Sequence, residues 1–446
     1  MIVLVHEAGH LIVSKIQGVT VEVFSIGIGK KLFSFRKNDT EYRISLFPLG
    51  GYCKLKGNDE LKQAIEDDLD SIPAAKGSIY SLSPLKRIPI FLAGPVFNFL
   101  LALLLLVICE FIPFSYSSPG NKIILLSDYN MTENTDEVYP SDKAELKTGD
   151  TIINFNGSGI KTFYDLQNAV RHFLGGSAYI IVRRENEEKK LLIKPDLNKN
   201  GQYLIGVIPW YEPESFSIVK NSIADKAGLR AGDTILKING HRIKNNLDVR
   251  RFFGEKKLEI KYRRNNEILI SSLLIDNSTG IDNSIEHFGI IYRTGLYKKQ
   301  VNNIFSAVGH GFGEAFFILF KTVQGPFLLI SGKIDPAENL AGPIRIPVLL
   351  GEMTSASFKA GGFVMSILNF SKMISMLCIA FFFMNLLPIP ALDGGHILIS
   401  IIEGIKRRPI KPKNFYRYQL AGLFLIIVLA CFIILNDITS IRRGMM

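Results

Sequence analysis

Residues 99–108 read FLLALLLLVI, an uninterrupted apolar run within a longer apolar stretch that covers residues 88–113. A helix needs about 20 apolar residues to cross the hydrocarbon core of a bilayer, so this stretch predicts a transmembrane span. The rest of the chain shares the bias, because 47% of its 446 residues are hydrophobic and 21% are charged. This composition excludes a disordered chain and a wholly water-soluble protein.

Other apolar stretches are also predicted to be embedded in the membrane, at residues 1–18, 363–387 and 418–435. A further apolar stretch, residues 305–330, contains His310, Glu314 and Lys321. We interpret it as an amphipathic helix that lies in the membrane interface rather than across the bilayer. The chain is therefore expected to be an α-helical polytopic membrane protein with about four transmembrane helices.

Basic residues gather in the loops that join the first span to the second and the third span to the fourth. They are Lys30, Lys31, Lys86 and Arg87 in the first loop, and Lys406, Arg407, Arg408, Lys411, Lys413 and Arg417 in the second. Such loops stay on the cytoplasmic side, so the long segment between the second and third spans is expected outside. This distribution also accounts for the net charge of +11. A nucleic-acid-binding protein is the weaker alternative, because no recognition motif accompanies the basic residues.

The external segment contains an internal repeat, in which residues 144–157 (AELKTGDTIINFNG) recur as residues 227–240 (AGLRAGDTILKING), an offset of 83 residues. In each copy a Gly-Asp turn leads into a strand that ends in an Asn-Gly turn, which predicts a β-hairpin. The repeat resembles that of PDZ domains, so two small α+β domains, inserted between the second and third spans, are expected at residues 118–208 and 209–297. A PDZ domain binds an extended peptide beside its own edge strand; the alternative is a pair of β-rich domains with no peptide groove. The first copy has Glu145 where the PDZ family usually has glycine.

Residues 19–55, between the first two spans, have a pattern typical of two β-strands, with a polar turn at residues 37–40 (KNDT). Unpaired strand edges cannot face lipid. We therefore expect a membrane-associated β-hairpin whose edge is buried in protein, lines a water-filled cavity or pairs with another strand.

His6, Glu7 and His10 form an HExxH motif inside the first apolar stretch. Residues four apart lie on the same face of a helix, so both imidazoles can reach one cation. Imidazole suits Zn²⁺, and the Glu7 carboxylate can take a proton from a water molecule at the metal. Ionisable residues are costly in an apolar helix and mark functional sites. The alternative is that neighbouring helices satisfy these polar groups.

A catalytic zinc site needs a third protein ligand, and Asp393 is the best candidate. It lies in residues 385–396 (NLLPIPALDGGH), where two prolines and a glycine pair must break the helix of the third span. Two alternatives remain open. His396 is a rival ligand by its chemistry, and Asp393 is also suited to cap a helix over residues 394–405.

Together these motifs resemble those of the intramembrane site-2 zinc metalloproteases, most closely the bacterial two-PDZ, regulator-of-sigma-E-type members. The matching motifs are the HExxH, residues 24–29 (FSIGIG), 48–52 (PLGGY), 93–98 (AGPVFN), 340–344 (LAGPI) and 385–393. The resemblance implies that His6, His10 and Asp393 bind one Zn²⁺ ion per chain and that Glu7 is the catalytic acid/base. It also implies a set of substrate-binding residues, namely Asn385, Pro388, Gly27, Gly29, Gly50 and Gly51.

The same resemblance implies an activity and a location. The expected activity is hydrolysis of peptide bonds within transmembrane segments of single-span membrane proteins, such as anti-sigma factors or remnant signal peptides. The expected location is a bacterial inner (cytoplasmic) membrane, with the PDZ-like domains on the periplasmic side. The expected partners are these substrates, the lipid bilayer and peptide termini at the PDZ-like domains, without nucleic acid.

The membrane part is then expected at residues 1–117 and 298–446. Five residues precede His6, fewer than in most family members, so either the first span is short or the true start lies upstream.

Two other functions are weaker alternatives: a PDZ-bearing scaffold that has lost catalysis, and a zinc transporter or sensor. The intact HExxH motif with Asp393 argues against the scaffold. Glu7 argues against the transporter or sensor, because a pure binding site has no need of a carboxylate that is not a ligand.

Overall fold

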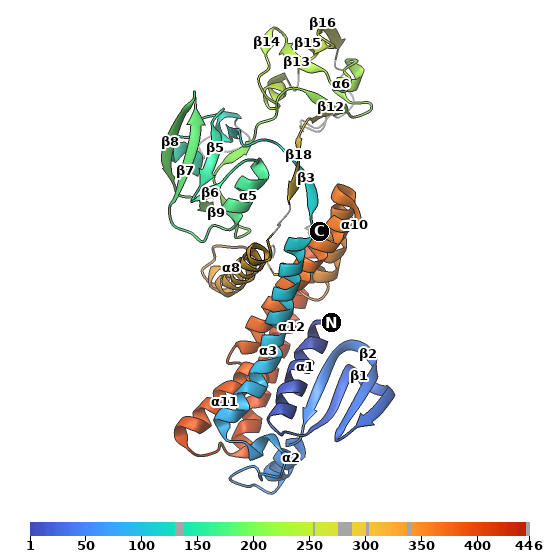
Figure 1. The fold of residues 1–446 in the computed structure, drawn as a ribbon, viewed down its shortest axis with the longest axis vertical. Helices are drawn as coiled ribbons and strands as arrows, with labels where there is room; N and C mark the ends of the chain where they lie inside the picture. The colour runs from blue at the N-terminus through green and yellow to red at the C-terminus, as the bar shows by residue number, and fades with distance from the viewer. Residues whose placement is uncertain (130–137, 253–254, 275–287, 300–302, 337–339, 443–446) are drawn as a thin grey trace. The chain divides into compact units, whose positions relative to one another are not determined.

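The computed structural model describes residues 1–129, 138–252, 255–274, 288–299, 303–336 and 340–442 (Figure 1). The chain divides into two compact units, one of Met1–Phe114 with Gln300–Met446 and one of Ser115–Lys299. The finer division into four domains stays a prediction. Residues 275–287, within the expected second PDZ-like domain, lie outside the described residues.

The first unit is built from helices and a β-hairpin. Its helical elements are α1 (Ile2–Ile16), α2 (Asn58–Glu66), η1 (Ile79–Ser81), α3 (Pro84–Phe111), α8 (Ile304–Ile330), α10 (Arg345–Leu386), α11 (Asp393–Lys406) and α12 (Pro412–Arg442). The central helix is α3, against which α1, α8, α10 and α11 pack. Ala102 and Leu106 of α3 are buried together with Ala315 of α8 and Cys378 of α10. The helix α3 therefore brings the N-terminal and C-terminal parts of the chain together.

Within the described residues, helices long and apolar enough to cross a membrane occur at Pro84–Phe111, Ile304–Ile330, Gly361–Leu386 and Pro412–Thr439. Three of them coincide with expected spans. The helix α1, whose apolar stretch is short for a span, has 15 residues against the about 20 that a span needs. The helix α8 has 27 residues and is long and apolar enough to cross a membrane, and its expected place in the interface stays a prediction.

The helix α10 consists of two arms joined at a kink. The backbone is non-helical at Gly361 and Gly362, and the φ of Gly362 is +66°, which glycine adopts without a steric cost. The two arms lie side by side: the Asn369 amide of the second arm donates a 2.7 Å hydrogen bond to the Ser357 hydroxyl of the first arm. The start of the first arm is held by the buried Asp437 of α12, whose carboxylate accepts hydrogen bonds from the backbone amides of residues 342, 344 and 345.

The predicted hairpin is present as β1 (Val21–Lys37) and β2 (Thr40–Leu55). Both strands are bent, so that their residues pair as a sheet of four segments. The segments lie in the order 31–37, 40–45, 21–28 and 51–55. Residues 51–55 therefore form one edge of this sheet.

Glycines with positive φ permit these bends, namely Gly27 (+88°), Gly29 (+97°) and Gly50 (+101°). Other residues rarely adopt such angles. The sheet also exposes large apolar side chains, including Ile28, Leu32, Phe33, Phe35 and Phe47. A patch of this kind is typical of a surface that contacts a membrane or another protein.

The second unit contains both copies of the repeat, and each copy forms a four-stranded sheet with the same strand order. The first sheet contains β6 (Ser158–Gly159), β5 (Thr151–Phe155), β7 (Ala178–Arg184) and β8 (Glu187–Ile193). The second contains β14 (His241–Arg242), β13 (Thr234–Ile238), β15 (Lys257–Arg264) and β16 (Glu267–Leu274). As predicted, an Asn-Gly turn joins the first two strands of each repeat. That either copy is a PDZ domain stays a prediction.

Shorter elements complete the second unit. They are β3 (Phe114–Ser118), β4 (Ile123–Leu125), η2 (Ser127–Tyr129), α4 (Pro140–Lys143), α5 (Phe163–Arg171), β9 (Asp196–Leu197), β10 (Tyr203–Leu204), β11 (Val207–Pro209), β12 (Ser215–Ile218), α6 (Ile223–Lys226), η3 (Asp248–Phe252), β17 (Ile290–Tyr292) and β18 (Gly295–Lys299).

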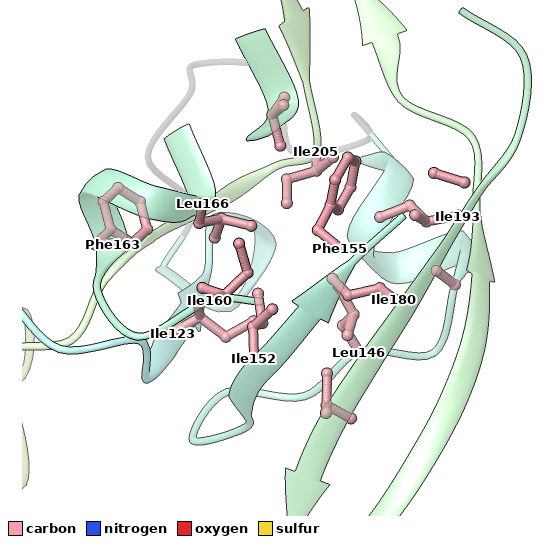
Figure 2. Close-up of a cluster of buried hydrophobic side chains, with 14 of the residues drawn as sticks. Ile123, Leu146, Ile152, Phe155, Ile160, Phe163, Leu166, Ile180, Ile193 and Ile205 are labelled. Atoms are coloured by element: carbon pink, nitrogen blue, oxygen red, sulfur yellow. The ribbon is translucent and has the colours of Figure 1, made fainter. Parts of the chain in front are cut away.

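Each copy of the repeat has its own apolar core. Ile152 and Phe155 are buried in the first copy, beneath α5 (Figure 2), and Ile235 and Ile238 take the same places in the second. The copies differ at the turn before β5 and β13, where Glu145 replaces glycine. Its φ is +58°, against +73° for Gly228. Both copies therefore need a left-handed residue here, which explains why glycine is usual at this position.

A buried carboxylate binds an arginine at the same place in both copies. Asp150 accepts two hydrogen bonds of 2.7 Å from Arg184, and Asp233 accepts two of 2.8 Å from Arg264. Each carboxylate is 1% exposed. The hydrogen bonds to these carboxylates raise the pKa of both arginines above the usual range, because they favour the charged guanidinium.

Removal of one of these arginines is expected to destabilise its sheet. Arg264→Met leaves the Asp233 carboxylate buried without a cation, which costs about 3 kcal/mol. The matched control is Arg263→Met, because Arg263 is the adjacent, exposed residue of β15. Amide hydrogen exchange of β13 and β15 in the full chain measures the difference. Equal protection in the two variants would contradict a stabilising role for the pair.

Candidate active site

His6 and His10 lie on one face of α1, where this helix packs against α3. Their Nε2 atoms are 3.2 Å apart, and His10 is 9% exposed. The one-turn spacing predicted from the HExxH motif is therefore present, and both rings point to the same place.

Asp393 reaches the histidines because the chain turns sharply after α10. The turn contains Pro388, Pro390 and Ala391, and the φ of Ala391 is +71°. The Asp393 Oδ2 atom lies 3.2 Å from His6 Nε2, and its Oδ1 atom lies 3.5 Å from His10 Nε2. The alternative in which Asp393 caps a helix is wrong, because α11 begins at Asp393 itself and has no side-chain cap.

The donor atoms of His6, His10 and Asp393 all lie within 4.8 Å of one another. Asp393 Oδ2 is buried, and no residue described in the structure donates a hydrogen bond to it. Two imidazole nitrogens and a carboxylate are the kind of donor set that zinc takes in catalytic sites, with a fourth position left for water or substrate. The three residues therefore fit a zinc ion.

Two further residues orient the imidazole rings. His10 Nδ1 donates a 2.8 Å hydrogen bond to the backbone carbonyl of Ile90, which leaves the Nε2 lone pair directed toward Asp393. The Asn98 amide lies 3.4 Å from His6 Nδ1, and its Oδ1 atom is buried without a partner among the described residues. Exchange of the amide nitrogen and oxygen by a flip lets Asn98 accept a hydrogen bond from His6 Nδ1.

Asn98 belongs to a motif that resembles one of the site-2 proteases, and no function was predicted for it from the sequence. The signal was available, because a polar amide inside the apolar helix α3 needs a partner. Asn98 is 1% exposed.

Two glycines allow α1 and α3 to approach each other at the histidines. A Cβ atom on Gly94 would lie 2.4 Å from His10 Nε2 and 2.7 Å from His6 Nε2. A Cβ atom on Gly9 would lie 2.5 Å from the carbonyl oxygen of Ala93. Any larger residue at either position would therefore push the two helices apart or displace the rings.

Glu7 lies between the His-Asp cluster and the edge segment of the hairpin. It is close enough to His6, His10 and Asp393, and to the backbone amide of Cys53 on β2, for electrostatic interaction. A Cβ atom on Gly51 would lie 3.7 Å from Glu7 Cγ. The edge formed by residues 51–55 thus passes beside the Glu7 carboxylate.

The other residues that sequence analysis assigned to substrate binding are not part of this cluster. Gly27, Gly29 and Gly50 lie at the bends of the hairpin. Asn385 lies in the last turn of α10, and Pro388 lies in the turn that leads to Asp393.

The rival ligand His396 also lies outside the cluster. Its ring stacks on Phe91, with 4.8 Å between the ring centroids, and it also contacts the ring of Phe415. A histidine held between two aromatic rings in this way has a packing role, so the geometry favours Asp393 as the third donor.

A sequence model of peptidase family M50 matches residues 1–429, which is nearly the whole chain. The chain belongs to peptidase family M50. Two similar proteins are named "Putative zinc metalloprotease". The relative from Treponema pallidum is 28% identical over 436 residues, which cover 97% of this chain and 95% of the relative. The relative from Borreliella burgdorferi is 30% identical over 446 residues, which cover 99% and 96%. Protease RseP of Yersinia pestis is 27% identical over 450 residues, which cover 96% and 94%.

Membership of family M50 confirms the resemblance to site-2 proteases. This M50 peptidase is a zinc-dependent metalloprotease and a multi-pass membrane protein. Enzymes of this family act within the lipid bilayer on membrane proteins.

Proposed function

We propose that this M50 peptidase hydrolyses peptide bonds within the transmembrane segments of single-span membrane proteins, at a site where His6, His10 and Asp393 hold one zinc ion and Glu7 is the general base and acid. The convergence of two histidines and an aspartate from distant parts of the chain carries this proposal. When bound, zinc supplies a Lewis acid that polarises the scissile carbonyl and lowers the pKa of the attacking water.

The protein residues hold the donors and move the proton. Ile90 and Asn98 keep the imidazole Nε2 atoms directed toward Asp393. The Glu7 carboxylate takes a proton from water and passes it to the leaving amine. Its place between the cluster and the hairpin puts it beside a substrate bound along residues 51–55.

The substrate must be unwound before it is cleaved, because the peptide bonds of a helix are occupied by i to i−4 hydrogen bonds. An edge strand can hold the unwound segment through backbone hydrogen bonds, whatever its side chains are. We assign this role to the edge at Gly51, with Gly27, Gly29 and Gly50 shaping the sheet. We include Asn385 and Pro388 in the proposed substrate site, because both lie in the stretch of chain that leads to Asp393.

We further propose that the protein lies in the bacterial inner membrane, with the second unit on the periplasmic side. The basic loops between the first two spans and between the last two support this orientation. The proposed substrates are anti-sigma factors or remnant signal peptides. The proposed PDZ-like domains would admit substrates with small external parts and exclude substrates with bulky external domains.

The zinc dependence of cleavage tests this proposal. Purified protein in detergent micelles is expected to contain about one zinc ion per chain and to cleave a single-span test substrate inside its apolar segment. The chelator o-phenanthroline is expected to abolish cleavage, and added Zn²⁺ to restore it. Cleavage that survives complete loss of zinc would reject the proposed chemistry. A zinc-loaded protein that cleaves no single-span protein would favour the scaffold alternative.

A further inference from the structure

A row of three cations crosses the second sheet of the repeat unit. Lys237 of β13 lies directly opposite Arg242 of β14 on one side and Lys261 of β15 on the other. Like charges in directly opposed cross-strand positions repel each other and destabilise a sheet. The row of cations therefore does not stabilise this sheet.

No described acidic residue forms an ion pair with these three cations. Two glutamates line the same cavity as the three cations and have other partners. Glu212 accepts a 2.9 Å hydrogen bond from Trp210 Nε1, and Glu214 forms a 3.0 Å ion pair with Arg293.

The first copy of the repeat shows that the fold does not require the cations. Its sheet has the same strand order, and the residue that matches Lys237 is Asn154. Asn154 lies opposite Gly159 and Ile181, so the corresponding row carries no charge. The row is therefore a property of the second copy alone.

The cation row lines a cavity of about 830 Å³ on the open face of the second sheet. Its other cations are Lys122, Lys244 and Arg263. Apolar surface lies between the charges, supplied by Trp210, Pro213, Leu236, Ile243 and Ile268. The Lys122 ammonium lies 3.8 Å from the centre of the Trp210 ring, which fixes the tryptophan as one wall.

We propose that this basic cleft, defined by Lys237, Arg242, Lys261 and Trp210, binds an acidic segment of a partner protein. The row extends over two strand spacings, about 10 Å, a length that several carboxylates along a peptide can match and a single phosphate group cannot. The apolar walls of the cleft suit apolar side chains that alternate with the carboxylates along the bound peptide. The cleft lies on a sheet face, so it is distinct from the edge at which a PDZ domain adds a peptide strand.

Binding of a labelled peptide tests the proposal. The probe is a fluorescein-labelled peptide in which glutamate alternates with leucine, added to the full chain in phosphatidylcholine nanodiscs. The triple variant K237Q/R242Q/K261Q is expected to bind it at least about tenfold more weakly than the wild type. The matched control, R183Q/K189Q/K190Q, removes the same charge from the first sheet and is expected to bind within about twofold of the wild type. Added salt is expected to weaken the wild-type complex.

Three results would overturn the proposal. Equal binding by the cleft variant would place the peptide elsewhere, and equal losses in both triple variants would show an effect of net charge alone. Flotation of the protein with phosphatidylglycerol vesicles, lost in the cleft variant and without peptide binding, would assign the cleft to a lipid surface. Without ligand, the cleft variant is expected to unfold at the same or a higher temperature, because it removes like-charge repulsion. That readout separates lost binding from lost folding, and neither depends on the proposed protease activity.

Discussion

Glu7→Gln is expected to retain zinc at the wild-type level and to lower the rate of cleavage by at least about 1,000-fold. Glutamine has nearly the shape of glutamate, so α1 and the adjacent hairpin are not disturbed. The three zinc-donor residues are unchanged, and Glu7 is not one of them. What is lost is the ability to accept a proton from water and to return it to the leaving amine.

Zinc analysis and single-turnover cleavage of a single-span substrate measure the two properties separately. Glu66→Gln is the matched control, because Glu66 lies at the end of α2, where its exposed carboxylate pairs with Lys62. The control is expected to cleave like the wild type. Cleavage by Glu7→Gln at the wild-type rate would mean that another group is the base, and loss of its zinc would make Glu7 a ligand.

Asp393→Ala is expected to lose zinc, because two histidines alone leave the ion without its anionic donor. Asn98→Ala is expected to have an intermediate effect, a decrease in zinc affinity of about 10-fold to 100-fold, because it removes a group that orients His6. His396→Gln is the control, since His396 is a rival ligand in sequence and is packed between aromatic rings in the structure. It is expected to bind zinc with wild-type affinity.

Competition with a fluorescent zinc chelator measures these affinities without reference to activity. The expected order of affinity is wild type and His396→Gln, then Asn98→Ala, then Asp393→Ala. Zinc loss in His396→Gln with zinc retained in Asp393→Ala would reverse the assignment of the third donor. A wild-type affinity in Asn98→Ala would remove the proposed support of His6.

Sequence reasoning predicts those features of the site that depend on residues close to one another in the sequence. The same-face placement of His6 and His10 follows from helix geometry. The break before Asp393 follows from prolines and glycines close to it in sequence. By contrast, the hydrogen bond that His10 donates to the Ile90 carbonyl, the contact of His6 with Asn98 and the steric need for Gly94 depend on how α1 packs on α3. A single sequence does not specify that helix crossing.

The same distinction holds for the fold. Both sheets of the repeat were predictable, because each carries an Asn-Gly turn and alternating strands. The hairpin between the first two spans was predictable as two strands, whereas its pairing as four segments depends on bends at positive-φ glycines. The membrane placement of α1 and α8 stays a prediction, because helix length and a few ionisable residues give opposite indications for these two helices.

The close contact at Gly94 has a consequence for how substrate enters the enzyme. With no side chain at this position, the backbone of α3 rests directly against both imidazole rings. A wider separation of α1 and α3 would move the histidines away from Asp393, so the zinc-donor set depends on this contact. We therefore expect a substrate segment to reach the site from the side of the hairpin and not by passing between α1 and α3.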